Sequence, residues 1–179
     1  HGEVNTLQWT NLSGPVTAGG SINCSMMCSL PMGGLQLTRR IEMPVDQPLF
    51  HVTEEIRNLN KYGRMFNIVQ HVTIAPPFLD KNTLFDCNAG KGFENKEDGS
   101  LEQESPVFVW PDATNHEGDK INLRMFEVKW PRVVTFLYNT DEEYCWVTAC
   151  NANLNLMLAY LWRRQDYPCL LYTSDAADE

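Results

Sequence analysis

The sequence predicts an all-β protein, a β-sandwich with antiparallel strands, and two observations lead to this class. Several segments alternate apolar and polar residues with a period of two, which is typical of strands that bury one face. Between them stand short stretches rich in Gly, Pro and Asn, the residues that favour turns. We find no long segment with the 3.6-residue period of a helix and no internal repeat. We therefore expect one β-sandwich domain over residues 1–168.

Three alternating segments are expected to be consecutive antiparallel strands. Residues 35–43 place Leu35 and Leu37 on one face and polar side chains on the other. Residues 49–58 and 66–74 repeat this pattern on either side of a turn-forming stretch. Their apolar faces are expected to share one core, which includes Phe50, Val52, Ile56, Ile68 and Val72.

The second half of the chain begins with a polar, Gly-containing stretch. Between about residues 76 and 123 the alternation is lost, which indicates a long and mostly surface-exposed insertion. Strand-like segments then resume at residues 124–130, 132–139, 144–151 and 155–162. The last of these is also compatible with a short helix on its apolar residues alone.

Length and charge limit the classes of partner. The chain has 179 residues, of which 43% are hydrophobic and 21% charged, and this is ordinary for a globular domain. A formal net charge of -9 disfavours nucleic acid and anionic membranes as partners, whereas neutral small molecules suit it better. There is no apolar run near the roughly 18 residues that a membrane helix needs. We expect neither a nucleic-acid nor a membrane partner.

The six cysteines do not form a recognisable framework. Cys24 and Cys28 are four residues apart and Cys145 and Cys150 five apart, and neither spacing is that of a zinc site. An unpatterned set of cysteines is typical of free thiols in a reducing compartment. We therefore expect a cytoplasmic protein that binds no metal.

Both ends of the chain are unusual. It starts at His1 rather than Met, which suggests an N-terminus that has been cut. Residues 169–179, "CLLYTSDAADE", back-translate into a sequence that resembles the transposon-end adapter of sequencing libraries, read in frame. We expect this segment not to be native and to add no strand to a sheet; a short, solvated acidic tail is the alternative.

His71 is the most informative single residue of the first half. Strict alternation over residues 66–74 places it opposite the apolar face of that segment. A lone histidine there is most often a half-exposed residue without a role. The motifs that precede His71 along the chain indicate a functional role for it.

The order of motifs along residues 1–71 is distinctive. "HG" at His1 precedes Trp9, and "FHVTEEIRNLNKYGRMFNIVQH", residues 50–71, joins a strand, an "N-L" turn and a segment that ends on His71. This arrangement resembles the galactose mutarotase-like family, and the resemblance covers most of residues 1–168. Members of that family, the aldose 1-epimerases among them, are large antiparallel β-sandwiches that bind sugars in a groove on one sheet.

The resemblance implies roles for particular residues. His71 matches the general acid that protonates the sugar ring oxygen, and His1 matches the residue that binds the hydroxyls around the anomeric carbon. Asn67 and Gln70, on the same segment as His71, are expected to contact substrate. The base, a glutamate in the family, would lie beyond Pro168, so the chain as given is expected to be inactive.

The chemistry explains the choice of residues. Mutarotation opens a hemiacetal when a base takes the proton of the anomeric hydroxyl while an acid protonates the ring oxygen. The ring then closes on the other face of C1. Histidine suits the acid because its pKa lies near neutral pH, and no metal or other cofactor is needed.

Among the five tryptophans, Trp110 is the best candidate for stacking on a sugar, because it lies in the predicted insertion. The substrate is expected to be a neutral monosaccharide or a related sugar. Two other interpretations stay open: a non-catalytic carbohydrate-binding β-sandwich, and a β-domain with a purely structural role.

Overall fold

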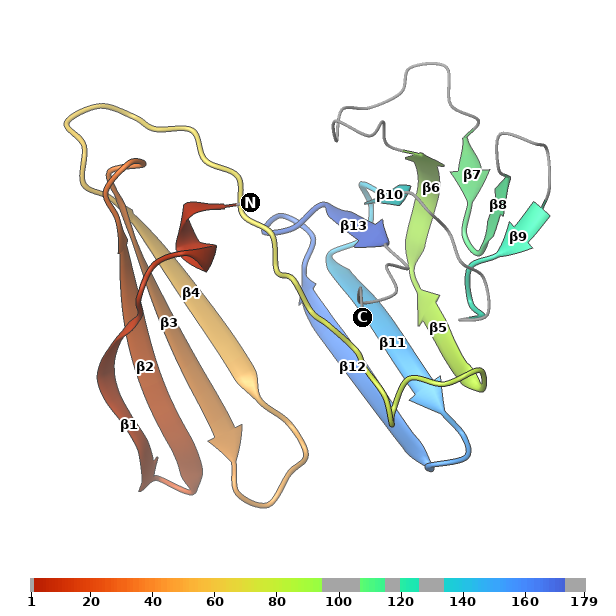
Figure 1. Cartoon of the computed structure of the whole chain (residues 1–179), viewed down its shortest axis with the longest axis horizontal. Coiled ribbons are helices and arrows are strands. Elements are labelled where there is room, and N and C mark those ends of the chain that lie inside the picture. Colours follow the sequence, from red (N-terminus) through yellow and green to blue (C-terminus); the bar gives the residue numbers. More distant parts are fainter. Residues whose placement is uncertain (1, 95–106, 115–119, 126–133, 173–179) are drawn as a thin grey trace. The chain divides into compact units, whose positions relative to one another are not determined.

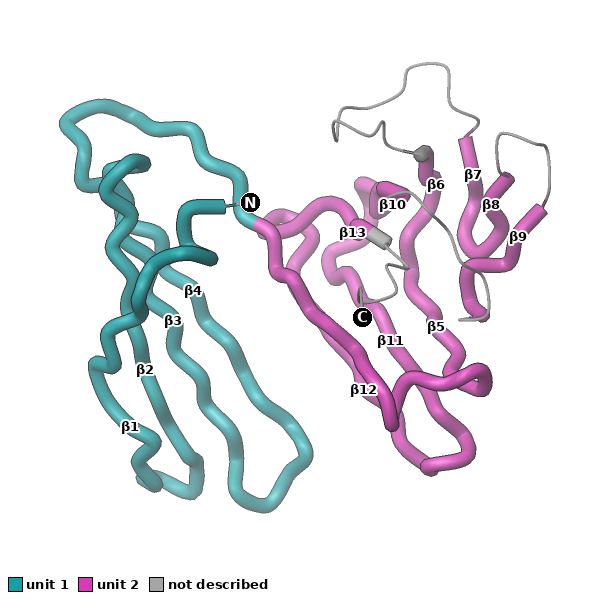
Figure 2. Tube along the Cα trace, in the orientation of Figure 1, with its two compact units in different colours: residues 1–68 teal, residues 69–179 magenta. Residues whose placement is uncertain are grey.

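The computed structural model describes residues 2–94, 107–114, 120–125 and 134–172 (Figure 1). Thirteen strands and one short 3₁₀ turn, η1 (Glu3–Asn5), make up the regular structure of these residues, and every strand pairing is antiparallel. The predicted all-β antiparallel class is confirmed. The chain divides into two compact units, residues 1–68 and 69–179 (Figure 2).

Unit 1 is a single four-stranded sheet with the order β1-β2-β3-β4. The two central strands carry its buried apolar residues, Cys28, Leu35 and Leu37. The first strand is polar and almost wholly exposed, so its sequence has no alternation by which it could be predicted. The bounds are β1 (Thr10–Ala18), β2 (Ser21–Leu30), β3 (Leu35–Pro44) and β4 (His51–Asn58).

The predicted pairing of residues 35–43 with residues 49–58 is confirmed. β3 and β4 are antiparallel neighbours, and Leu37 lies opposite Ile56. The predicted burial is wrong in part, because Phe50 and Val52 are each 45% exposed. β4 is the edge strand of its sheet, so its side chains have a neighbouring strand on one side only.

The strand predicted at residues 66–74 does not form. Residues 64–75 have no regular structure, and Val72, expected in the core, is 45% exposed; Ile68 is half-buried. Alternation shows only that the two faces of a segment differ in polarity. A strand also needs a neighbouring strand whose backbone pairs with it. His71 therefore lies in an irregular segment between β4 and β5, not on a sheet.

Unit 2 contains two sheets, ordered β13-β10-β6-β7-β8-β9 and β12-β11-β5. The predicted irregular insertion over residues 76–123 is wrong, because five of these strands lie within it. The segment at residues 155–162 is a strand rather than a helix, and most of residues 124–130 lie outside the described part of the chain. The bounds are β5 (Thr83–Cys87), β6 (Ala89–Glu94), β7 (Phe108–Val109), β8 (Asp112–Thr114), β9 (Lys120–Asn122), β10 (Val134–Tyr138), β11 (Tyr144–Asn151), β12 (Leu156–Arg163) and β13 (Cys169–Tyr172).

The core of unit 2 joins its two sheets, as in a β-sandwich. Phe136 of β10 is fully buried and meets the ring of Trp110 edge to face, with centroids 5.3 Å apart. Tyr138 meets Trp162 of the other sheet in the same geometry at 5.5 Å. Gly92 of β6 faces the Phe136 ring so closely that a Cβ atom would collide with it, so glycine is required there.

The expectation that residues 169–179 add no strand is wrong. β13 pairs with β10 from Leu137 opposite Cys169 to Val134 opposite Tyr172, and Leu170 packs against the core. An unpaired strand edge accepts any short apolar segment within reach, whatever its origin. That these residues are not native stays a prediction.

A buried polar network fixes one end of the three-stranded sheet. Asn151, fully buried at the end of β11, donates to the Phe78 carbonyl at 2.8 Å and to Thr83 Oγ1 at 3.4 Å. Its carbonyl oxygen accepts the backbone N–H groups of Asn153 at 3.0 Å and Leu154 at 3.2 Å. One amide therefore joins the turn after β11 to the start of β5.

We expect Asn151→Ala to destabilise unit 2 strongly. The substitution removes the acceptor of the Asn153 and Leu154 N–H groups and one of the two donors to the Phe78 carbonyl, which keeps the Thr83 hydroxyl at 2.9 Å. It also replaces a fully buried side chain by a smaller one, and we expect a total cost of about 1–3 kcal/mol. Asn153→Ala, at an exposed neighbouring position, should change the free energy of unfolding by less than about 0.5 kcal/mol. Urea denaturation followed by fluorescence measures both, and equal midpoints for the two variants would contradict the role given to Asn151.

Candidate functional site

The predicted site residues are distributed over the two units. His1 lies outside the described residues. Asn67 is exposed at the end of unit 1, whereas Gln70, His71 and Trp110 belong to unit 2. Whether any of them binds or acts on a sugar stays a prediction.

His71 has an accessible side chain. It is exposed, and its Nδ1 lies 3.5 Å from the hydroxyl of Thr73. Its neighbour Gln70 donates from Nε2 to the hydroxyl of Tyr167 at 3.2 Å. This bond ties the irregular segment to the residues that follow β12, so the backbone on the N-terminal side of His71 is anchored.

Trp110 is anchored in the core rather than displayed at a rim. It lies in the tight turn between β7 and β8, and its backbone N–H donates to the Gly90 carbonyl at 3.2 Å. The indole N–H donates to Asp86 Oδ1 at 3.0 Å, and the ring packs on Phe136. An indole that is half-buried, donates its N–H to a carboxylate and packs on a core phenylalanine serves mainly to stabilise the fold.

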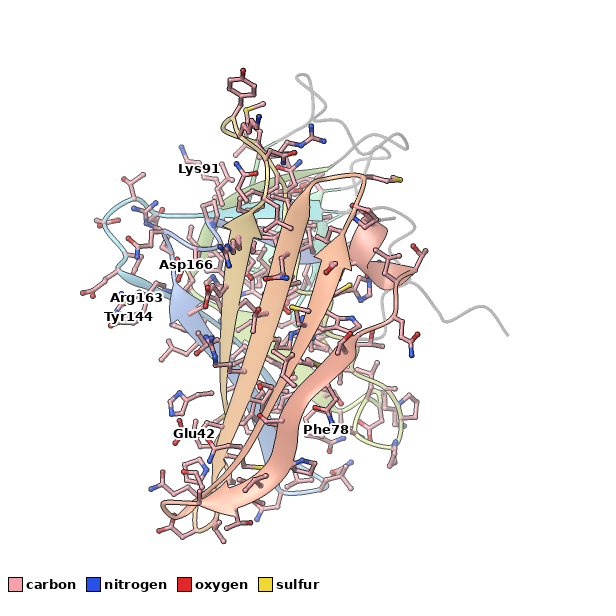
Figure 3. The ribbon with its side chains drawn as sticks, turned by 90° about the vertical axis from the view of Figure 1, so that its left-hand side faces the viewer. Glu42, Phe78, Lys91, Tyr144, Arg163 and Asp166 are labelled. Carbon is pink, nitrogen blue, oxygen red and sulfur yellow. The ribbon has the colours of Figure 1, made fainter. Side chains whose placement is uncertain are left out.

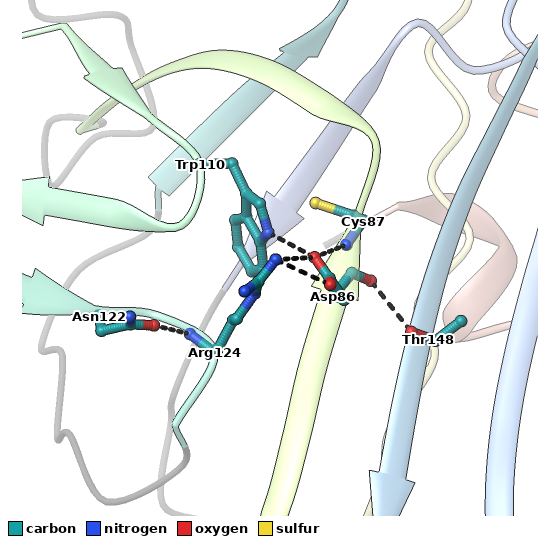
Figure 4. Close-up of polar contacts among 6 residues, drawn as sticks. All are labelled: Asp86, Cys87, Trp110, Asn122, Arg124 and Thr148. Carbon is teal, nitrogen blue, oxygen red and sulfur yellow. Dashed lines mark hydrogen bonds and ion pairs between the residues drawn. The ribbon is translucent and has the colours of Figure 1, made fainter.

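Asp86 is the centre of a polar cluster that joins three elements (Figure 4). Its carboxylate accepts the Trp110 indole N–H, the Cys87 backbone N–H at 2.9 Å, and both contacts from Arg124 Nη2, at 3.0 and 2.9 Å. Its backbone carbonyl lies 3.5 Å from the Thr148 hydroxyl of β11. The cluster holds the β7–β8 turn and the segment after β9 against β5.

Backbone pairing brings Arg124 to Asp86. After β9 the chain runs beside β5, where Phe85 donates to the Arg124 carbonyl at 2.9 Å and Leu84 bridges to Met125. The backbone N–H of Arg124 donates to Asn122 Oδ1 at 3.0 Å. The guanidinium is thus presented to a carboxylate 38 residues earlier in the chain, a pairing that no local sequence signal reveals.

The surroundings of Asp86 keep it ionised. Desolvation, the largest single influence, would raise its pKa, but the hydrogen bonds from Trp110, Arg124 and Cys87 and the charge of Arg124 together outweigh it, and the pKa is lowered. A carboxylate with a lowered pKa and four donor contacts is a weak proton acceptor at neutral pH. The cluster is therefore suited to holding a fold together rather than to general base catalysis.

The buried thiols of unit 2 are also unsuited to chemistry at neutral pH. Desolvation raises the pKa of Cys87 to about 12, and it raises the pKa of Cys145 as well. A thiol needs a lowered pKa to act as a nucleophile. All six cysteines are free, and among the described residues no three His, Cys, Asp or Glu side chains are grouped to hold a metal ion.

Comparison of the chain with family models, with curated proteins and with solved structures found no significant match. Within the part of the chain that the structure describes, no helix is long and apolar enough to span a bilayer.

The lowered pKa of Asp86 predicts an effect of acid on stability. Because the folded pKa lies below the unfolded value of about 3.9, the stabilisation by Asp86 is present above that pH and is lost as the pH falls through the folded pKa. Asp86→Asn should lose less stability than the unsubstituted chain between about pH 5 and pH 3. The difference should stay below about 1 kcal/mol, since the side chain is 40% exposed.

Asp141→Asn, at an exposed site, is the matched control and should follow the unsubstituted chain over the same pH range. Asp80, whose pKa is lowered chiefly by the backbone N–H of Asn82, is present in all three proteins and cancels in the comparison. Denaturation midpoints measured at successive pH values test this, and parallel curves for all three proteins would show that Asp86 contributes nothing.

The ion pair itself is measurable by a double-mutant cycle. Asp86→Asn, Arg124→Gln and the double variant should give a coupling free energy of about 0.2–1 kcal/mol, the range found for partly exposed pairs. The coupling should shrink at 1 M salt, because surface charges are screened. A coupling of zero at low salt would mean that the two side chains are ordered by the backbone alone.

Proposed function

We propose that this chain belongs to a sugar-active protein of the aldose 1-epimerase type, in which His71 is the general acid. The observation that carries the proposal is the motif order over residues 50–71, which ends on an exposed imidazole in an all-β antiparallel protein. A ligand in solution reaches this side chain without rearrangement of a core, and Gln70 anchors the adjacent backbone.

The proposed step consists of two proton transfers, one to the ring oxygen of the sugar and one from its anomeric hydroxyl. Protonated His71 gives its proton to the ring oxygen of the sugar while a carboxylate removes the proton of the anomeric hydroxyl, so the C1–O5 bond breaks and C1 becomes an aldehyde. Ring closure on the opposite face returns both protons. His1, Asn67 and Gln70 are proposed to bind hydroxyls, and no cofactor enters the reaction.

A second candidate is a non-catalytic sugar-binding protein with the same fold. The state of Asp86 favours it, because this carboxylate is occupied by its hydrogen-bond donors and has a lowered pKa. In this candidate the residues around His71 hold a sugar without opening its ring. The two candidates differ in one measurable property, the rate of anomer exchange.

Polarimetry of freshly dissolved α-galactose or α-glucose tests the proposal. We expect no acceleration by the 179-residue chain, since the resemblance puts the base beyond Pro168. A chain extended past Pro168 in its native reading frame should accelerate mutarotation, and His71→Asn should lower that rate by about 10²-fold or more.

His51→Asn replaces another exposed histidine, on β4, and should keep the full rate. Circular dichroism should show both variants folded. A His71→Asn variant with full activity would refute the role of His71, and an extended chain that binds galactose without accelerating anomer exchange would leave the binding protein as the function.

A further inference from the structure

The three-stranded sheet of unit 2 has one face on the core and one on the opposite side, here called the outer face. On β11, Cys145 and Ala149 point to the core and are 0% and 2% exposed. The alternate residues, Tyr144, Trp146 and Thr148, therefore lie on the outer face. Two aromatic side chains thus stand two residues apart along one strand, about 6.7 Å from each other.

The neighbouring strand continues this surface. β12 places Arg163 directly opposite Tyr144 and Leu161 directly opposite Trp146. Tyr144 is 42% exposed and Leu161 is 68% exposed, and Figure 3 shows Tyr144 and Arg163 side by side. The outer face therefore offers aromatic and aliphatic area to solvent beside a cationic side chain.

Polar groups on this surface are unused. The hydroxyl of Tyr144, the indole N–H of Trp146 and the guanidinium of Arg163 make no hydrogen bond or ion pair with other residues in the described part of the chain. Two other indoles of unit 2 differ, because Trp110 donates to Asp86 and Trp162 donates to the Tyr167 carbonyl at 2.9 Å. A half-buried indole N–H usually has a hydrogen-bond partner. The N–H of Trp146 has none within the described part of the chain, so it is available for a ligand.

We propose that the outer face binds a neutral oligosaccharide, with Tyr144 and Trp146 stacked on successive sugar rings and Arg163 donating to hydroxyl oxygens. A sugar ring combines an apolar C–H face with peripheral hydroxyls, and this surface combines aromatic area with three free donors. A net charge of -9 disfavours a polyanionic glycan. The proposal goes beyond the epimerase function, since it uses none of the residues assigned to that reaction.

Charge argues against a second copy of the chain as the occupant. Face-to-face association through the outer face would bury Arg163 and needs a free carboxylate to meet it. The acidic residue that β5, β11 and β12 place on this face is Asp86, which already pairs with Arg124 at 2.9 Å. An uncharged hydroxyl-rich ligand makes no such demand.

The test titrates the 179-residue chain with cellohexaose and with maltohexaose and follows binding by calorimetry and by tryptophan fluorescence. At least one of the two probes should bind. Tyr144→Ala should weaken that binding at least tenfold, and Arg163→Gln should weaken it about threefold. Tyr62→Ala removes a tyrosine that is 84% exposed in unit 1, and it should bind like the unsubstituted chain.

Each remaining outcome decides the question. Binding of neither hexasaccharide, or equal affinity for the Tyr144→Ala and Tyr62→Ala variants, overturns the proposal. So does a preference for polygalacturonate over both neutral probes. A dimer seen by sedimentation that Leu161→Ser dissociates would identify a second copy as the occupant. His71→Asn should leave hexasaccharide binding unchanged, so failure of the epimerase function and failure of this site are separable.

Discussion

Asn151 is a fully buried amide, and the three-stranded sheet depends on the satisfaction of its polar groups. Its four hydrogen bonds reach the Phe78 carbonyl, Thr83, and the turn that leads into β12. In the ladder Asn151 stands opposite Thr83 on one side and Leu156 on the other. A shift of either neighbouring strand by one residue would break this set and turn every side chain to the wrong face.

The positions farther along the sheet follow from that register. Asp86 comes to lie opposite Thr148, from which it reaches Trp110 and Arg124, and Tyr144 comes to lie opposite Arg163. The polar cluster and the outer face are therefore consequences of one buried contact at the far end of β11. Buried polar groups act here as they do in other proteins, where an unpaired alternative is costly enough to exclude other registers.

Strands that can be predicted from the sequence differ physically from those that cannot. β3 alternates apolar and polar residues over most of its length, so its side-chain pattern identifies it. β12 is apolar in all but its last residue, so its sequence fits a strand or a short helix equally well. β5 to β9 are short, and glycines such as Gly92 contribute to a core without any apolar signal. Residues 66–74 show the opposite case, an alternating segment without a partner strand. The contact of Asp86 with Arg124 depends on the tertiary fold, so the sequence held no sign of it.

Arg39 is a charged residue whose position on β3 is explained by its contacts. Alternation in residues 35–43 puts it on the apolar side of its strand, an unusual place for a guanidinium. There it pairs at 2.6 Å with Glu54, whose side chain is 8% exposed, and lies over the ring of Trp9. The ion pair lets two charged residues occupy the apolar side of the sheet.

The ring of Trp9 is the only indole among residues 1–68, since the other four tryptophans all follow residue 100. With the Arg39 guanidinium 5.0 Å from its centroid, its emission depends on an intact β3 and on the chain before β1. Trp9 is therefore an intrinsic fluorescent probe of unit 1. A chain in which the later tryptophans are replaced by phenylalanine would report the folding of the first sheet by itself, without any dye or added tag.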